Sequence, residues 1–225
     1  MLSPKILYED NHLLIVYKPA GILTQPSGTQ QENMENICKQ WIKETYHKPG
    51  QVFLEAVHRL DKPVSGIVVF ARTSKALSRL NAAMRNQQFQ KTYCALVEGC
   101  VDPQKGVLEH YLVHDDYQSR VVPAGTPQAK FCRLNYQVLQ KTLRHSLVEI
   151  ELETGRYHQI RAQLSALGYP IVGDSKYGAH EKYPFQTIAL HHSKLKFPHP
   201  TLEQTIHVHA PLPVEMQEFF TQAGD

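Results

Sequence analysis

An aspartate stands among cationic side chains in the segment HRLDKPVSG, residues 58–66. Asp61 lies close to Arg59, and the Lys-Pro step that follows disfavours a regular helix or strand at that point. The apolar run IVVFA comes next, so we expect the carboxylate at the irregular entrance of a buried strand. A carboxylate placed there can act as a nucleophile or a general base. It can equally cap a turn, and this segment alone leaves both interpretations open.

A tyrosine with a small neighbour lies in the strand-like segment KTYCALVEG, residues 91–99. Alternation along a strand puts the ring of Tyr93 on the same face as Ala95. The small side chain of Ala95 leaves space for a planar group to stack against the ring, and proteins hold unpaired bases by stacking of this kind. Core packing is the alternative for Tyr93.

An arginine lies near apolar residues in the segment GRYHQIRAQ, where a helix is expected over residues 156–168. Tyr157 and His158 precede Arg161 by four and three residues, so the three would share one helix edge. An arginine so near a buried face needs an anion, and a carboxylate offers it two parallel hydrogen bonds. Asp61 is our candidate partner. A surface salt bridge or a solvated Arg161 is the alternative.

Cationic side chains are concentrated between residues 59 and 91, where Asp61 is the one acid. A local positive excess of this kind is expected of a surface that meets phosphate groups. A solvated helix face is the alternative. The cations in this window are Arg59, Lys62, Arg72, Lys75, Arg79, Arg85 and Lys91.

The elements that must position these residues alternate between short strands and amphipathic helices. Few long connections separate the strands, which predicts an α+β class with a largely antiparallel sheet. Ser74 is the expected N-cap of the second helix. Helices are expected over 32–46, 75–88, 156–168 and 213–222, and strands over 5–8, 12–17, 52–57, 66–73, 91–99, 106–113, 130–139 and 146–153, with two more strands before the last helix.

Length and composition are those of a globular protein that needs no metal or disulfide to build a core. The 225 residues carry a net charge of +3, and we expect a single domain over residues 1–225. The four cysteines are scattered, which favours free thiols in a reducing compartment. The apolar runs are too short to span a bilayer, and no signal pattern opens the chain, so we expect a cytoplasmic protein.

Four segments together resemble the RluA-type family of RNA pseudouridine synthases, in the family's order and at workable spacings. The resemblance runs from the KPAG segment at residues 18–21 through Pro200. It implies the family fold, a mixed, mainly antiparallel central sheet flanked by helices and loops, with a central cleft. The segments are VHRLDKPVSGIVVFA, QKTYCALVEG, ETGRYHQIRAQLSALGYPIVGDSKYGA and ALHHSKLKFPHP.

The resemblance also implies a role for each candidate residue. Asp61, in the H-R-L-D motif, would be the catalytic residue, and Arg161 would pair with its carboxylate. Tyr93 would stack on the target uracil. Arg59 would enter the RNA and hold the place of the flipped nucleotide. The substrate would be a uridine in tRNA, in large-subunit rRNA, or in both.

The chain departs from the family pattern at two positions: Val64 replaces a usual threonine, and Gln25 replaces a frequent histidine. Neither carries a group that we assign to the chemistry. No S4-type RNA-binding domain is expected before the catalytic domain. The resemblance implies no cofactor and no metal, and we expect a monomer that binds RNA and no membrane.

Other functions fit the sequence less well. A protein-kinase catalytic loop would need an arginine directly before the aspartate, whereas Leu60 separates Arg59 from Asp61 here, and a glycine-rich nucleotide loop is missing. The histidines near the C-terminus lack the ligand spacing of a zinc site, which favours surface or hydrogen-bonded histidines. A non-catalytic RNA-binding module or RNA chaperone with the same fold is the main rival. The retention of Asp61, Tyr93 and Arg161 together argues against that rival, because binding alone does not require them.

Overall fold

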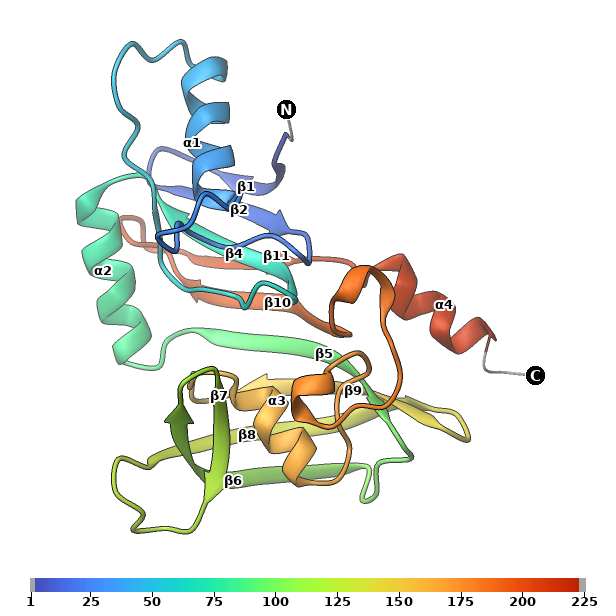
Figure 1. Cartoon of the computed structure of the whole chain (residues 1–225). Coiled ribbons are helices and arrows are strands. Elements are labelled where there is room, and N and C mark those ends of the chain that lie inside the picture. The colour runs from blue at the N-terminus through green and yellow to red at the C-terminus, as the bar shows by residue number, and fades with distance from the viewer. Residues whose placement is uncertain (1–2, 223–225) are drawn as a thin grey trace. The chain divides into compact units, whose positions relative to one another are not determined.

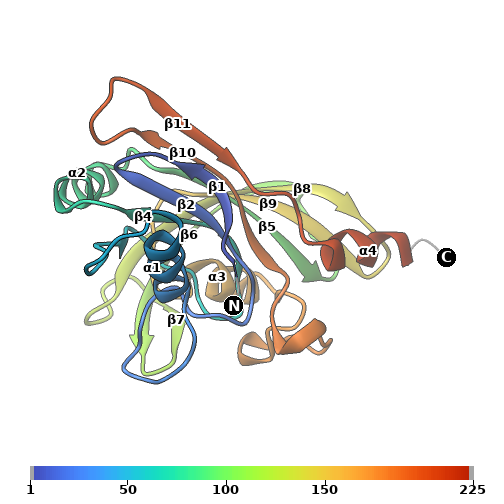
Figure 2. The same cartoon turned by 90° about the horizontal axis from the view of Figure 1, so that it is seen from above.

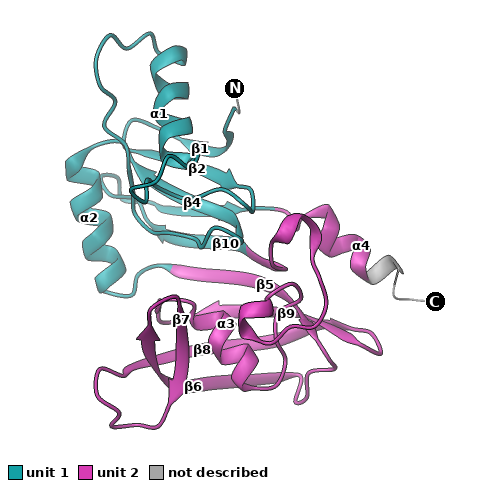
Figure 3. Ribbon diagram, in the orientation of Figure 1, with its two compact units in different colours: residues 1–89, 192–210 teal, residues 90–191, 211–225 magenta. Residues whose placement is uncertain are grey.

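The computed structural model describes residues 3–222, with side chains described through residue 219. The chain forms two compact units, which Figure 3 shows in different colours. Unit 1 comprises residues 1–89 and 192–210, and unit 2 comprises residues 90–191 and 211–225. Asp61 and Arg59 belong to unit 1, whereas Tyr93 and Arg161 belong to unit 2.

Unit 1 is built on strands in the order β1-β2-β4-β10, with β3 paired to β4 and β11 paired to β10. Figures 1 and 2 show these elements, and in Figure 2 the antiparallel β10–β11 hairpin runs along one side of the unit. The elements are β1 (Lys5–Glu9), β2 (Leu13–Lys18), α1 (Met34–Thr45), β3 (Glu55–Ala56), β4 (Ser65–Ala71), α2 (Ser74–Arg85), β10 (Leu190–Pro198) and β11 (Thr205–His209).

Strand β4 is the centre of unit 1, and it carries the Asp61 segment at its N-terminal end. All seven of its residues are buried, as expected for a strand that is apolar on both faces. Gly66 has φ +123°, and a Cβ there would lie 2.3 Å from the main-chain oxygen of His192 in β10. Only glycine therefore permits this close approach of the two strands at the start of β4.

Helix α2 packs its apolar side on the strands of unit 1. Ala76, Leu80 and Ala83 are buried in one cluster with residues of β2, β4, β10 and β11. The expected N-cap was wrong by one residue: the Thr73 side chain accepts the Ala76 N–H at 3.1 Å, and Ser74 is already helical. The threonine is preferred because its extended backbone lets its oxygen reach the third N–H of the helix.

Unit 2 is an antiparallel sheet in the order β5-β9-β8-β6-β7, with α3 packed on β6 and β7. Its elements are β5 (Gln90–Glu98), β6 (Lys105–Asp115), β7 (Gln118–Val122), β8 (Lys130–Lys141), β9 (His145–Leu152), α3 (Gln159–Ala166), the 3-10 turns η1 (Ser175–Tyr177) and η2 (Pro184–Gln186), and α4 (Val214–Gln222). Figure 1 shows α3 in front of these strands.

The predicted class, α+β with a mixed, mainly antiparallel sheet, is confirmed, but several elements differ from the expectation. Strand β7 was not predicted, because its residues lie in a polar stretch without alternation. The expected strand over 52–57 is reduced to the two residues of β3, Glu55–Ala56. Among the described residues, no helix is long and apolar enough to cross a membrane.

Helix α3 is shorter than the expected helix over 156–168, and it is buried nearly all round. His158 precedes it with φ +52°, so Tyr157 and His158 lie outside the helix. The polar side chains of the helix are buried because they have internal partners. Gln163 donates to the main-chain oxygen of Leu108 at 2.9 Å, and Gln159 donates to that of Arg133 at 3.1 Å.

Candidate active site

Asp61 lies in the irregular segment directly before β4, as the Lys-Pro step predicts. The residue is half-buried, and its main-chain oxygen accepts the Val64 N–H at 3.0 Å, which closes a turn. Val64, where the family pattern has threonine, is 2% exposed and contributes its aliphatic side chain to the core. This main-chain hydrogen bond therefore fixes the backbone of Asp61.

The loop that follows β2 holds the main chain of the Asp61 segment through side-chain and main-chain hydrogen bonds. Thr24 Oγ1 donates to the Leu60 oxygen at 2.9 Å and accepts the Leu60 N–H at 3.1 Å. The Gly21 N–H donates to the Lys62 oxygen at 2.8 Å. The residues on both sides of Asp61 are thus fixed to one loop, residues 18–24, which contains the KPAG segment.

Lys18, at the end of β2, is a buried cation close to this segment that the sequence analysis did not single out. Its side chain is fully buried, and Nζ donates to three main-chain oxygens, those of Pro19 (3.0 Å), Ile22 (2.7 Å) and Lys62 (3.2 Å). Burial lowers the pKa of Lys18 to about 7, and the negative charge of Asp61 opposes that shift. Lys18 is therefore a cationic neighbour of Asp61 inside unit 1.

Two other residues of the H-R-L-D motif have different environments. Arg59 is exposed, as a residue that meets RNA would be. His58 is half-buried, and its Nε2 accepts the Val69 N–H at 3.3 Å, so this nitrogen carries no proton. Its ring also meets the ring of His192 edge to face, at 5.5 Å between centroids. His58 thus ties the motif to β4 and β10.

Tyr93 in unit 2 is 7% exposed and lies on β5, opposite Ile150 of β9. Lys91 lies two residues earlier on the same face of the strand, and its Nζ would lie 3.4 Å from a Cβ added to Gly155. Burial lowers the pKa of Lys91. The face of β5 that carries the aromatic ring therefore also carries a half-buried amine, which the sequence analysis did not include among the site residues.

Arg161 forms a buried ion pair with Asp174, a residue that the sequence analysis did not single out. Arg161 Nε donates to Oδ2 at 2.6 Å and NH2 donates to Oδ1 at 2.8 Å, and the guanidinium lies 4.9 Å from the centre of the Tyr177 ring. The predicted need for a carboxylate is thus met within unit 2. The pairing of Arg161 with Asp61 stays a prediction. Asp174 could have been noticed as the acid of the VGDSKYG segment, which follows the helix after only a short turn.

His158 binds NH1 of the Arg161 guanidinium, whereas the two bonds to Asp174 use Nε and NH2. Arg161 NH1 lies 2.8 Å from His158 Nε2, and NH1 can only donate, so Nε2 accepts and Nδ1 carries the proton. Nδ1 then donates to the Tyr177 hydroxyl at 2.9 Å, which also accepts the Ser119 N–H at 2.8 Å. Burial, together with the charge of Arg161, lowers the pKa of His158 to about 3. His158 is therefore neutral at physiological pH and can keep accepting from Arg161.

The expected helix edge of Tyr157, His158 and Arg161 is wrong in its geometry, because only Arg161 is helical. The three side chains nevertheless form a continuous row of contacts. The ring of Tyr157, which is 43% exposed, stacks on the ring of His158 at 3.8 Å between centroids, and His158 in turn contacts Arg161. The left-handed backbone of His158 makes this arrangement possible, because it turns the chain immediately before α3 begins.

The C-terminal histidines are divided between buried and exposed positions. His199 is buried and lies 2.7 Å from Asp10 through Nε2, whereas His207 and His209 are exposed on β11. Within residues 3–222, no three His, Cys, Asp or Glu side chains are grouped so that they could hold a metal ion.

Comparison with known proteins gives one consistent result. The family model described as RNA pseudouridylate synthase matches residues 12–166. The chain is 37% identical over 216 residues to the uncharacterized RNA pseudouridine synthase YhcT of Bacillus subtilis (strain 168), a match that covers 94% of this chain and 70% of that protein. It is 33% identical to ribosomal large subunit pseudouridine synthase C of Vibrio cholerae serotype O1, covering 96% of this chain and 68% of that protein. It is also 30% identical to tRNA pseudouridine synthase C of the same organism, covering 98% and 96%.

Solved structures show the same fold. The chain superposes on human RNA Pseudouridylate Synthase Domain Containing 4 with a TM-score of 0.82 at 25% identity, covering 97% of this chain and 92% of that one. Human RNA Pseudouridylate Synthase Domain Containing 1 gives a TM-score of 0.75 at 24% identity, covering 94% and 84%. The second likeness, at its lower identity, bears on the fold alone.

Proposed function

The chain belongs to the RluA-type family of RNA pseudouridine synthases and is therefore an isomerase that acts on RNA, and we propose that it converts specific uridines of tRNA or large-subunit rRNA to pseudouridine with Asp61 as the catalytic carboxylate. Relatives of both substrate types, named for the large ribosomal subunit and for tRNA, support the two RNA classes. The proposal includes action in the cytoplasm, by one chain and without a cofactor.

The observation that carries the catalytic assignment is the way in which unit 1 holds Asp61. Thr24, Gly21 and Lys18 bond the main chain on both sides of the residue, so the side chain projects from a fixed backbone. The charge of Asp61 also raises the pKa of buried Lys18 against the effect of burial, so the two groups interact electrostatically.

The reaction requires only groups of the kinds found here. The N1–C1′ bond of the uridine breaks, the base turns, and a bond forms between C5 and C1′. The C5 proton is lost and N1 gains a proton, so the product is an isomer and no oxidant or energy donor is consumed. An ionised Asp61 can start this sequence by attack on C1′ or by removal of the C2′ proton.

Three further residues complete the proposal. Tyr93 stacks on the uracil and keeps the detached base in place while it turns. Arg161, held by Asp174 and His158, meets the Asp61 carboxylate when RNA is bound. Arg59, exposed beside the catalytic residue, takes the place of the uridine that leaves the RNA stack.

RNA contact is further supported by aromatic and cationic side chains around the β6–β7 hairpin of unit 2. Tyr117 is 77% exposed, and Lys176 Nζ donates to its main-chain oxygen at 3.1 Å and lies 5.9 Å from its ring centre. Tyr157 presents another exposed ring, with His114 packed on its edge at 4.5 Å between centroids. Exposed rings beside cations suit unpaired bases and their phosphates. We assign the choice of RNA target to this hairpin and the loop that follows it, residues 114–130.

The direct test is pseudouridine formation in RNA from cells that lack the protein. The wild-type protein is incubated with total tRNA and with ribosomal RNA, and new pseudouridines are mapped by carbodiimide labelling and primer extension. We expect discrete modified positions with wild type and none with Asp61→Asn, which should bind RNA as tightly as wild type. Glu151→Gln, an exposed carboxylate on β9, is the matched control and should remain active.

Two results would contradict the proposal. Full activity in Asp61→Asn would remove the catalytic assignment. RNA binding by wild type without any new pseudouridine in either RNA class would favour the non-catalytic binding module instead.

A further inference from the structure

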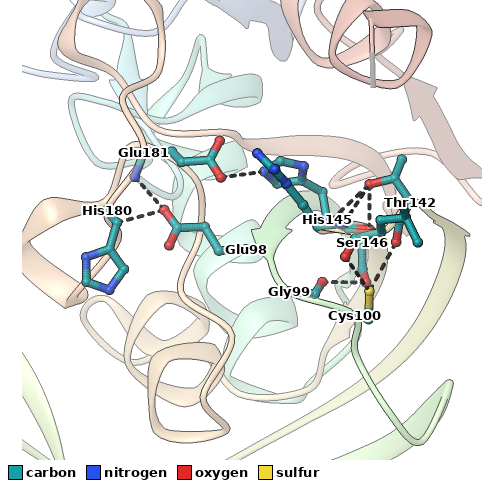
Figure 4. A network of polar contacts seen from close by, with 10 residues as sticks. Glu98, Gly99, Cys100, Thr142, His145, Ser146, His180 and Glu181 are labelled. Carbon is teal, nitrogen blue, oxygen red and sulfur yellow. Dashed lines mark hydrogen bonds and ion pairs between the residues drawn. The ribbon is translucent and has the colours of Figure 1, made fainter. Parts of the chain in front are cut away.

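We propose that Glu98, at the end of β5, is a positioning residue that places Asp174 and thereby Arg161 for the reaction. The inference rests on the proposed function, because it concerns the arginine expected to meet Asp61. Every contact that carries it lies within unit 2. Figure 4 shows the network around Glu98 from close by.

The Glu98 carboxylate clamps the segment that follows Asp174. Its Oε1 accepts the N–H of His180 at 2.8 Å and the N–H of Glu181 at 2.7 Å, as the dashed lines at the left of Figure 4 show. Hydrogen bonds from main-chain N–H groups to an ionised carboxylate are short and strong. Two adjacent bonds to one oxygen fix the direction of the main chain at residues 180 and 181, as well as its position.

From Glu181 the constraint passes to the residue before Asp174. The Glu181 main-chain oxygen accepts the Gly173 N–H at 3.1 Å. Gly173 has φ +86°, and a Cβ there would lie 2.5 Å from Cβ of Tyr183 and 2.6 Å from the oxygen of Thr187. The two stretches of chain are therefore in direct contact with no room for a side chain. Asp174 is the next residue, so the position of its carboxylate depends on where Gly173 contacts the segment of residues 181–187.

A second bond holds the same segment on its other side. His145 Nε2 lies 2.8 Å from the Glu181 carboxylate, and His145, at the start of β9, is 5% exposed. The base of the clamp is itself rigid. The Gly99 N–H donates to the oxygen of Arg144 at 2.6 Å, and Ser146 Oγ donates to the oxygen of Gly99 at 2.9 Å. Figure 4 shows Gly99, His145 and Ser146 on the side of the network away from His180.

The path from Glu98 thus ends at the arginine that the proposed function pairs with Asp61, and not at a general packing contact. Asp174 directs two of its bonds to Arg161, so a displaced segment would turn the guanidinium. Strand β5 also carries Tyr93, so the aromatic ring and the clamp belong to one strand. A small displacement of a positioned group can cost about 100-fold in rate without a matching loss of binding.

The test separates positioning from binding and from folding. We expect Glu98→Ala to lower the single-turnover rate of pseudouridine formation by about 10- to 100-fold, while the Kd for RNA and the melting temperature change little. Glu98→Gln should recover most of the rate, because its amide oxygen still accepts both N–H groups. Glu151→Ala, which removes an exposed carboxylate from neighbouring β9, is the matched control and should behave as wild type.

A readout that needs no activity follows the Arg161 Nε–H signal by NMR, with Asp174→Asn as the reference for a lost ion pair. In Glu98→Ala the signal should move toward that reference. Glu98→Asp keeps the charge but shortens the side chain, so it should weaken the two N–H bonds and give an intermediate loss of rate, which keeps the test valid if Glu98→Ala folds poorly. An unmoved signal with a wild-type rate would overturn the inference, as would equal losses in Glu98→Ala and Glu98→Gln. Absence of activity in wild type would contradict the proposed function instead, and the NMR result would still decide the positioning of Arg161.

Discussion

Arg161 and Asp174 form a buried ion pair with two hydrogen bonds, Nε to Oδ2 at 2.6 Å and NH2 to Oδ1 at 2.8 Å, and the two side chains are 6% and 1% exposed. Removing water from two charges is costly, so such a pair adds little stability over apolar residues of similar size. Stability alone therefore does not explain the pair, and the role of Arg161 under the proposed function stays a prediction that substitutions can test.

Single and paired substitutions should separate the contribution of the ion pair to stability from its contribution to activity. Asp174→Ala should destabilise the protein by about 3–5 kcal/mol, because it leaves the guanidinium buried without its carboxylate. The double variant Arg161→Met with Asp174→Leu should recover much of that stability and still form no pseudouridine. Urea unfolding and the carbodiimide assay measure the two effects. A double variant that is both stable and active would show that the charge pair serves neither purpose.

Lys18 should make the stability of the protein depend on pH above neutrality. Burial lowers its pKa from 10.5 to about 7 in the folded state. Between these values the unfolded chain holds a proton that the folded chain has released, so the free energy of unfolding attributable to Lys18 rises with pH. The slope can approach about 1.4 kcal/mol per pH unit, and it should vanish below pH 7, where both states are protonated.

The measurement compares wild type with Lys18→Met by urea unfolding from pH 6 to pH 10. The difference between the two free energies of unfolding should favour wild type increasingly as the pH rises. Asp61→Asn removes the opposing charge and should move the steep range to lower pH. Parallel curves for wild type and Lys18→Met would contradict the lowered pKa.

Tyr93 should act through its ring rather than through its hydroxyl. Tyr93→Phe keeps the stacking surface and should retain most of the turnover rate, whereas Tyr93→Ala should lose it. Base–aromatic stacking contributes about 1–3 kcal/mol, so the loss should be on the order of 10- to 100-fold. Steady-state rates on one mapped RNA decide the matter. Equal losses in the two variants would assign an essential role to the hydroxyl.

Arg59 should matter most when the target uridine is paired or stacked. It is exposed, so Arg59→Ala should change the free energy of unfolding by no more than about 0.5 kcal/mol. Its rate should fall more on a folded RNA than on an unstructured oligonucleotide with the same uridine, since leaving a stack costs a few kcal/mol. Arg144→Ala, also exposed, is the control and should affect neither substrate. Equal losses on both RNAs would argue against a role in flipping.

Local patterns in the sequence predicted the elements but not the partners of the charged side chains. Strand β4 was evident because it is apolar on both faces, and the irregular position of Asp61 followed from the Lys-Pro step. Strand β7 has no such pattern, because three polar residues precede two valines without alternation, and it lies at the edge of the sheet beside β6. The predicted start of α3 was wrong because helical periodicity does not reveal the left-handed backbone of His158.

The sequence analysis chose the residues of the candidate site, whose chemistry stays a prediction, and it missed two residues that contact them or lie close to them. Asp61, Tyr93 and Arg161 were chosen from the sequence, but Lys18 and Asp174 depend on contacts between segments that are distant or separated by a turn. A buried lysine at the end of an apolar strand looks like an ordinary surface residue in a sequence. Only the three carbonyl oxygens around Nζ distinguish it.

The bonds from Thr24 and Lys18 reach main-chain atoms of Leu60 and Lys62, so they make no demand on the side chain at position 62. Evolution can therefore vary that side chain, which is exposed, and adapt the chain to new RNA surfaces without moving the carboxylate beside it. Residues 18 and 24 have no such freedom. Substitutions at position 62 would accordingly probe RNA contacts beside Asp61 and leave the loop beneath it unchanged.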